Sequence, residues 1–248
     1  MVRAAGRRLD RPPAGPPARV DFADARLGLP AAARLHALGA AAAARPSGRR
    51  GGASRLPKKL HEAVEEERTK APDRVVEVWA FDEHRAGLKP VIRRIWAKRG
   101  QRPVAVAHPR YKWLYLYAFV HPTSGAVEWF SGSTVDAALF SAVLARFAAA
   151  VGAGPHKRVL LVLDGAGWHV SADLVVPEGI RLVFLPPYSP ELQPAERLWP
   201  LTNEAIANRY FATLAELGRV LARRCRALTA QPHILGANTL FHWWPKTA

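Results

Sequence analysis

The chain has 248 residues, of which 49% are hydrophobic, so it is long enough for one substantial domain and an appendage. Its single cysteine, Cys225, excludes a disulfide framework and is expected to be a buried helix residue, and no apolar run reaches the roughly 18 residues of a membrane span. The net charge of +16 at pH 7 indicates a polyanionic partner, most simply nucleic acid, although a merely soluble basic protein would also carry such a charge.

Half of this net charge lies in residues 1–57, a low-complexity basic segment rich in alanine, proline and glycine. Such a composition cannot bury enough apolar surface to fold, so we expect the segment to be disordered. Two interpretations remain open: a basic arm that binds DNA phosphates, or an out-of-frame remnant whose sequence encodes no selected structure. The composition changes at Lys58, and residues 58–72 predict a linker helix that ends at Pro72.

Three strands are predicted to open the main domain, which spans residues 73–248. Residues 74–82 are rich in β-branched and aromatic side chains and predict the first strand. Residues 111–122 and 126–132 predict a β-hairpin, because a short turn segment at 123–125 separates them.

Helices and strands then alternate. Residues 134–151 predict a helix with Thr134 as the candidate N-cap, and the fully apolar run 157–164 predicts a strand that is buried on both faces. The remaining predicted elements are a short helix, a strand at 180–186, a helix over about 190–208 and an amphipathic helix over 213–228. This order predicts an α/β fold with a mixed sheet, three antiparallel strands followed by parallel strands, flanked by helices.

Three acidic residues, Asp82, Asp164 and Glu196, are the strongest functional signal. The two aspartates each end an apolar strand where the backbone is expected to leave the sheet, and ligands of α/β sheets bind at such ends. Glu196 follows four closely spaced prolines, in the expected first turns of a helix for which Ser189 is a plausible cap. Glu191 is the rival third acid, although it could simply favour the helix dipole.

Each of these aspartates alone could merely cap a turn or pair with an arginine. Brought together by a fold, three carboxylates are what a pair of hard divalent cations needs, and such pairs cleave and rejoin phosphodiester bonds. The sequence has no Cys/His cluster with zinc spacing. We therefore predict that Asp82, Asp164 and Glu196 are catalytic metal ligands for two Mg²⁺ (or Mn²⁺) ions.

Other polar and aromatic residues near these acids have two interpretations each. Glu83, His84 and His169 flank the predicted ligands, and they either hold the ligands or DNA in place or have plain structural roles. Trp243 and Trp244 are expected to cover the core rather than stack on bases. A basic stretch that contains Trp96 is either a phosphate-contacting edge or a solvated surface, and it comprises Arg93, Arg94, Lys98, Arg99 and Arg102.

The strings FDEHR (81–85), LDGAGWH (163–169) and LPPYSPELQPAERLW (185–199) resemble the DDE transposases of bacterial insertion sequences in the mariner superfamily. The resemblance covers roughly residues 58–248, and its last string is the most specific. It implies a ribonuclease H-like fold, shared with retroviral integrases. It also implies that Asp82, Asp164 and Glu196 are the first, second and third metal ligands. Gln193 stands where asparagine is commoner in the family.

The resemblance implies a DNA transposase catalytic domain that performs metal-dependent cleavage and strand transfer at the ends of an insertion sequence. It further implies double-stranded DNA as partner (transposon ends and target), no membrane partner, a homodimer as one option, and a nucleoid-associated protein of the bacterial cytoplasm. Residues 1–57 show none of the helix-turn-helix pattern with which such transposases normally begin. The alternatives are an inactive remnant that only binds DNA, another ribonuclease H-like nuclease, or a basic structural protein.

Overall fold

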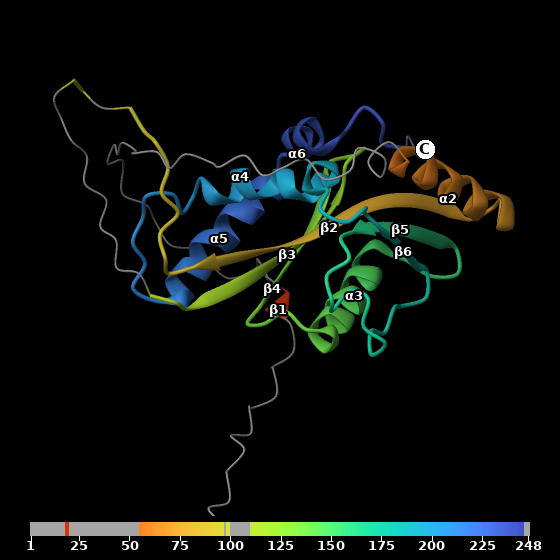
Figure 1. The fold of residues 1–248 in the computed structure, drawn as a ribbon, viewed down its shortest axis with the longest axis horizontal. Coiled ribbons are helices and arrows are strands. Elements are labelled where there is room, and N and C mark those ends of the chain that lie inside the picture. Colours follow the sequence, from red (N-terminus) through yellow and green to blue (C-terminus); the bar gives the residue numbers. More distant parts are fainter. Residues whose placement is uncertain (1–17, 20–54, 97, 100–109, 246–248) are drawn as a thin grey trace, which may run out of the picture.

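The computed structural model describes residues 55–96, 98–99 and 110–245, together with the backbone of Ala18–Arg19 (Figure 1). The predicted disorder of residues 1–57 therefore falls almost entirely outside the described residues, as does Arg102. No helix in the described ranges is long and apolar enough to cross a membrane.

The predicted mixed sheet is confirmed. Its strand order is β1-β4-β3-β2-β5-β6, in which β2, β3 and β4 are antiparallel neighbours and β5 and β6 run parallel to β2. The two-residue strand β1 pairs with β4 in an antiparallel direction, and the sequence did not predict it. The strands are β1 (Ala18–Arg19), β2 (Val75–Gly87), β3 (Trp113–His121), β4 (Ala126–Gly132), β5 (Lys157–Leu163) and β6 (Ile180–Phe184).

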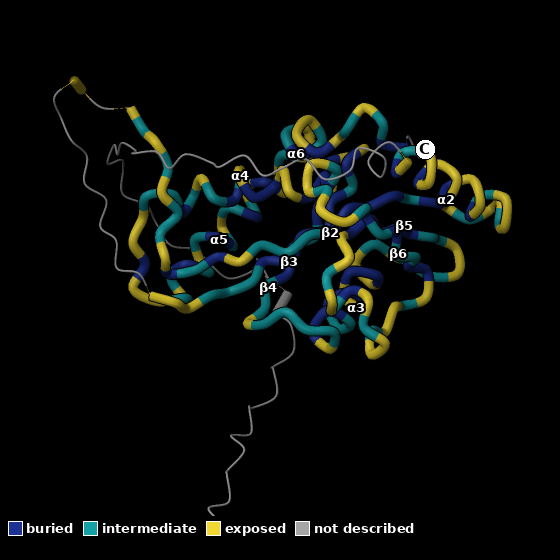
Figure 2. Tube along the Cα trace, in the orientation of Figure 1, coloured by how far each residue is buried: buried dark blue, intermediate teal, exposed yellow. Residues whose placement is uncertain are grey.

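Alternation along β2 divides the core between the two faces of the sheet. Trp79 and Phe81 pack toward α3 (Ala137–Val151), whereas Val78 and Ala80 belong to a second buried cluster on the opposite face. Figure 1 shows α3 on one side of the sheet and the remaining labelled helices on the other, and Figure 2 shows the central strands buried between them. The helices of the second face are α2 (Leu56–Lys70), the short α4 (Leu198–Asn203), α5 (Leu214–Thr229) and α6 (Pro232–Thr239).

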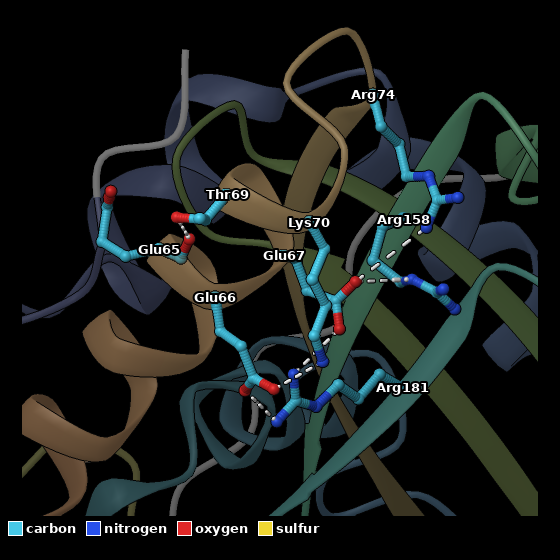
Figure 3. Close-up of polar contacts among 8 residues, drawn as sticks. All are labelled: Glu65, Glu66, Glu67, Thr69, Lys70, Arg74, Arg158 and Arg181. Atoms are coloured by element: carbon cyan, nitrogen blue, oxygen red, sulfur yellow. Dashed lines mark hydrogen bonds and ion pairs between the residues drawn. The ribbon is translucent and has the colours of Figure 1, made fainter.

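Helix α2 is a full member of this core. It begins two residues before the predicted segment, and its Leu56 and Leu60 side chains are buried in the cluster that also contains Val78 and Ala80. Glu67 is only 5% exposed, and it forms ion pairs at 3.0 Å with Arg158 of β5 and at 2.8 Å with Arg181 of β6 (Figure 3). The helix that was predicted as a linker is therefore fixed to the sheet by both apolar packing and charge.

Two of the predicted helices differ from the structure. In place of one helix over 190–208, the chain forms two short 3₁₀ turns, η1 (Pro190–Leu192) and η2 (Pro194–Arg197), and then α4. Proline lacks the N–H of the helical ladder and its ring clashes with the preceding turn, so Pro194 prevents a continuous helix. Ser189 makes no capping hydrogen bond. The short helix predicted between β5 and β6 is also absent, because the described residues there form only turns, a bend and irregular chain.

The other helices follow the sequence more closely. Helix α3 has Asp136 as its N-cap rather than Thr134, because the Asp136 carboxylate accepts a hydrogen bond from the Leu139 N–H at 2.8 Å. Helix α5 agrees with the prediction and places Cys225 in the core, whereas α6 was not predicted. Trp244 is 3% exposed within the core cluster, which confirms its predicted structural role.

Candidate active site

The sheet register brings Asp82 and Asp164 to the same level. The parallel ladder between β2 and β5 ends with the pair Ala80 and Val162, and each aspartate lies two residues beyond its member of that pair. Because side chains alternate along a strand, both aspartates extend the face on which Ala80 and Val162 are buried. The strand β5 thus ends just before Asp164, as predicted.

Asp82 is not at the end of its strand, contrary to the prediction. Strand β2 continues to Gly87, and Asp82 pairs with Ala118 of β3. The reason is that the two edges of β2 end at different points: its ladder with β5 stops at Ala80, while its ladder with β3 continues to Gly87. Asp82 therefore lies where the sheet has already opened on one side.

Glu196 reaches the same place from η2. The buried residues Ala195, Leu198 and Trp199 pack η2 and α4 into the cluster on this face of the sheet, which leaves the intervening Glu196 exposed beside the strand ends. All three predicted ligands line one cleft of about 460 Å³. Glu191, the rival acid, does not line it.

The cleft is acidic although the chain is strongly basic. None of its twelve lining residues is lysine, arginine or histidine. Burial raises the pKa of Asp82 well above its ordinary value, and the negative charge of Glu196 raises it further. Although Glu196 is exposed as a residue, partial desolvation of its carboxylate raises its pKa, and so does the charge of Asp164. The charges of Asp82 and Glu196 are therefore not compensated by a basic side chain that lines the cleft.

A tryptophan holds the Asp82 carboxylate. Trp199 Nε1 donates a hydrogen bond to Asp82 Oδ2 at 2.6 Å. The indole in turn stacks on the His84 ring, with 5.0 Å between ring centroids and 15° between planes. His84 Nε2 lies 3.0 Å from Asn203 Oδ1, and burial lowers the pKa of this histidine, which favours its neutral form. His84 thus acts on the carboxylate through Trp199.

A buried histidine holds the Asp164 carboxylate. His169 is 1% exposed, and its Nδ1 lies 2.7 Å from Asp164 Oδ1. Its Nε2 lies 3.4 Å from Glu83 Oε2, and the other oxygen of Glu83 accepts a hydrogen bond from Trp168 Nε1 at 2.8 Å. Burial alone would lower the pKa of His169, but the two carboxylates raise it to about 9. The hydrogen bond from His169 lowers the pKa of Asp164.

Gln193 joins the segment 185–199, which carries Glu196, to the segment 81–85, which carries Asp82. It is 3% exposed, its Nε2 donates to the Phe81 carbonyl oxygen at 2.8 Å, and its Oε1 accepts from the Ala195 N–H at 3.3 Å. The same side chain therefore caps η2 and attaches it to the residue before Asp82. Trp168, Trp199 and Asn203 were not predicted as site residues. The two tryptophans could have been considered from the sequence, because an indole N–H that becomes buried requires a hydrogen-bond acceptor, and the nearby acids are such acceptors.

Within the described part of the chain, no group of three or more His, Cys, Asp or Glu side chains is arranged so that it could hold a metal ion. The predicted ligands share a cleft but do not form a preassembled site. Of the basic stretch, Arg93 is engaged with the protein, because its guanidinium donates to the Pro200 carbonyl oxygen at 2.9 Å. Arg94, Lys98 and Arg99 are exposed, and Trp96 is 94% exposed.

Two solved structures resemble this fold at low sequence identity. One is the Mos1 transposase in a paired-end complex with the left transposon end, at 16% identity and a TM-score of 0.47, covering 81% of this chain and 66% of that chain. The other is the catalytic domain of the Mos1 mariner transposase, at 14% identity and a TM-score of 0.40, covering 80% of this chain and 100% of that one.

Sequence relatives come from two bacteria. An uncharacterized protein y4pE/y4sA of Sinorhizobium fredii is 33% identical over 132 residues, which cover 53% of this chain and 96% of that protein. The uncharacterized 39 kDa protein of insertion element IS630 from Shigella sonnei is 28% identical over 155 residues, which cover 61% of this chain but only 43% of that protein. Residues 77–218 match the family model of the DDE superfamily endonucleases. This match includes all three acids of the cleft. The chain therefore belongs to the DDE superfamily of endonucleases.

Proposed function

We propose that this chain supplies the catalytic domain of a bacterial insertion-sequence transposase, which cleaves phosphodiester bonds and transfers strands at the ends of the element. The single observation that carries the proposal is the convergence of three carboxylates, from β2, from the end of β5 and from η2, in one cleft without a basic lining residue. The family match and the insertion-element relative support it.

We further propose that Asp82, Asp164 and Glu196 hold two Mg²⁺ or Mn²⁺ ions. Carboxylate oxygens are the donors that these hard cations prefer, and the mutual repulsion of the three acids is what a cation would relieve. When bound, such a pair of ions activates the attacking water or 3′-hydroxyl and stabilises the leaving oxygen.

The protein's own residues prepare two of these carboxylates. Trp199 fixes one oxygen of Asp82, and His169 fixes one oxygen of Asp164, so the rotation of each carboxylate is restricted before any ligand arrives. Gln193 keeps η2 against β2, which holds Glu196 near the two aspartates. Double-stranded DNA, as transposon ends and as target, is the proposed partner. A homodimer and a location at the bacterial nucleoid remain predictions.

Nicking of supercoiled plasmid by the full chain tests the chemistry. With Mn²⁺ or Mg²⁺ present, the wild type should nick the plasmid, while Asp164→Asn, Asp82→Asn and Glu196→Gln should each reduce the rate by at least about 100-fold. Glu191→Gln is the matched control, because Glu191 is an acid of the same motif that does not line the cleft, and it should keep wild-type activity. An inactive Glu191→Gln beside an active Glu196→Gln would overturn the assignment of the third ligand. Equal nicking by wild type and Asp164→Asn would place the activity elsewhere.

Thermal melting tests the metal separately from cleavage. Mn²⁺ in excess over its dissociation constant should raise the melting temperature of the wild type, because it binds the folded state. The increase should be lost in Asp164→Asn and kept in Glu191→Gln. Metal stabilisation without nicking would identify an inactive remnant, and preferential cleavage of RNA–DNA hybrids would identify another ribonuclease H-like nuclease.

A further inference from the structure

Tyr188 is placed at the mouth of the acidic cleft in an unusual way. It lines the same cleft as the three carboxylates, yet 95% of its surface is exposed to solvent. A large aromatic side chain normally contributes its area to a core or an interface. Here the ring contributes no burial to the fold.

The backbone of Tyr188 is also strained. Two non-glycine residues in the described part of the chain have a positive φ, Asn208 at 56° and Tyr188 at 57°. Asparagine tolerates this conformation, and the Asn208 side chain bonds both to the Arg93 N–H and to the Arg93 carbonyl oxygen, which accounts for its geometry. For a bulky residue such as tyrosine, the left-handed conformation costs free energy that some other interaction must offset.

No internal contact of the Tyr188 side chain accounts for that strain. Among the described residues, its ring and hydroxyl take part in none of the hydrogen bonds, ion pairs or ring contacts that the structure contains. The neighbouring prolines, Pro186, Pro187 and Pro190, restrict the backbone on both sides. The segment is therefore held so that an unpartnered aromatic ring stands beside the carboxylates.

We propose that Tyr188 stacks on an unpaired nucleobase adjacent to the phosphodiester that the carboxylates process. This inference rests on the proposed function. The ring is neutral, so it suits the face of a base rather than a phosphate, and every base offers such a face. In a duplex the neighbouring bases cover both faces, so the recognised base must be unstacked, either at a strand end or extruded from the helix.

A double-mutant cycle between protein and DNA tests the contact. Cleavage by the full chain is measured in Mn²⁺ on a short duplex with unpaired 3′ nucleotides, and an abasic nucleotide is placed in turn at each position around the cleavage point. Tyr188→Ala should slow cleavage of the normal DNA roughly 5- to 150-fold, and the effect should disappear on the DNA that lacks the one base on which the ring stacks. Coupling in the unpaired nucleotides indicates a base at a strand end, and coupling in the paired region indicates an extruded base.

Two further variants separate the ring from the backbone. Tyr188→Phe keeps the ring and should retain nearly wild-type rates. Tyr188→Gly removes the ring and relieves the positive φ, so it should be as impaired as Tyr188→Ala if stacking matters. Tyr111→Ala is the control, since Tyr111 is 75% exposed but does not line the cleft, and it should show no coupling to the same base.

The outcomes are distinct. The inference would be overturned if Tyr188→Gly cleaved at wild-type rates, or if Tyr188→Ala lost the same factor in rate on every abasic DNA. The proposed function would still stand in either case, provided that Asp164→Asn is inactive. If the wild type cleaves no DNA, 2-aminopurine placed at each unpaired position and read in Ca²⁺ reports stacking directly. Equal fluorescence with wild type and Tyr188→Ala at all positions then refutes the contact, and no binding of any DNA by the wild type refutes the proposed function as well.

Discussion

Two groups of acidic side chains in this protein have opposite surroundings. Glu66 and Glu67 of α2 meet Arg181 at 2.8 Å each, and Glu67 also meets Arg158, so their charges are compensated (Figure 3). Two acids of the cleft, Asp82 and Glu196, face other carboxylates instead, whereas the third, Asp164, is paired with His169. Both groups lie at the same sheet, and both include side chains withdrawn from solvent.

The pKa directions express this difference. Hydrogen bonds from Lys70 and Arg181 lower the pKa of Glu66 to about 2. Burial and the charge of Glu196 raise the pKa of Asp82. A compensated acid stabilises the fold, whereas an uncompensated one is retained at the expense of stability and indicates a ligand that is absent from the folded chain alone. The same change from acid to amide should therefore have opposite effects on stability in the two groups.

The largest stability effect is expected for Glu67→Gln. It leaves Arg158 and Arg181 without their buried partner, and it should lower the free energy of unfolding by about 1.5–3 kcal/mol, measured by urea denaturation. Glu65→Gln serves as the control, because Glu65 is on the exposed side of the same helix. A loss no greater than that of the control would mean that the ion pairs of Glu67 make no net contribution to the free energy of unfolding.

The next effect concerns Trp199→Phe, which removes the hydrogen bond to Asp82 but keeps an aromatic ring against His84. Trp199 is the side-chain donor that orients the Asp82 carboxylate, so the Mn²⁺ concentration for half-maximal nicking should rise about 10- to 100-fold. Circular dichroism checks that the variant is folded. An unchanged Mn²⁺ requirement in a folded variant would show that the indole does not position the carboxylate.

Asp82→Asn should raise the free energy of unfolding by about 0.5–2 kcal/mol when measured without divalent cations. The substitution removes a charge that Glu196 repels, and the asparagine oxygen can still accept the hydrogen bond from Trp199. Urea denaturation in EDTA provides the measurement. A destabilised Asp82→Asn would contradict the claim that this acid is uncompensated.

The smallest effect is the acid sensitivity of α2. The lowered pKa values of Glu66 and Glu67 mean that their stabilising contribution is complete above the ordinary value of 4.5 and is lost as the pH falls toward about 2. The melting temperature of the wild type should therefore fall over this range by more than that of a variant with both residues changed to glutamine. If the melting temperatures of the two proteins fell in parallel with pH, Glu66 and Glu67 would not be the source of the acid sensitivity.

Local sequence signals predicted the strands and the acids, but not how they meet. The apolar run before Asp164 is legible because a doubly buried strand needs no alternation. The true end of β2 is not legible, since the polar string Glu83–Arg85 resembles a loop and becomes a strand only because β3 pairs with it. The bond between Trp199 and Asp82 joins residues 117 positions apart, and no local pattern encodes it.

Prolines and caps explain the remaining errors. One helix was predicted over about 190–208, with the prolines leading into it, but Pro194 and the extended conformation of Gln193 divide its first part into short turns. Gln193 then acquires two roles, as a cap and as a link to Phe81, that only the folded chain reveals. The residue that differs from the commoner asparagine, Gln193, is thus the one whose side chain connects segment 185–199 to segment 81–85.

The register that places Asp82 level with Asp164 also restricts how this gene can change. Side chains alternate along a strand, so an in-frame codon gained or lost within β2 or β5 ahead of the aspartate would turn that carboxylate to the face of α3. Codons added to the turns at residues 170–178, between β5 and β6, would leave both aspartates in place. Length variation among functional descendants of this sequence should therefore accumulate after Asp164 and be absent from the two strands before it.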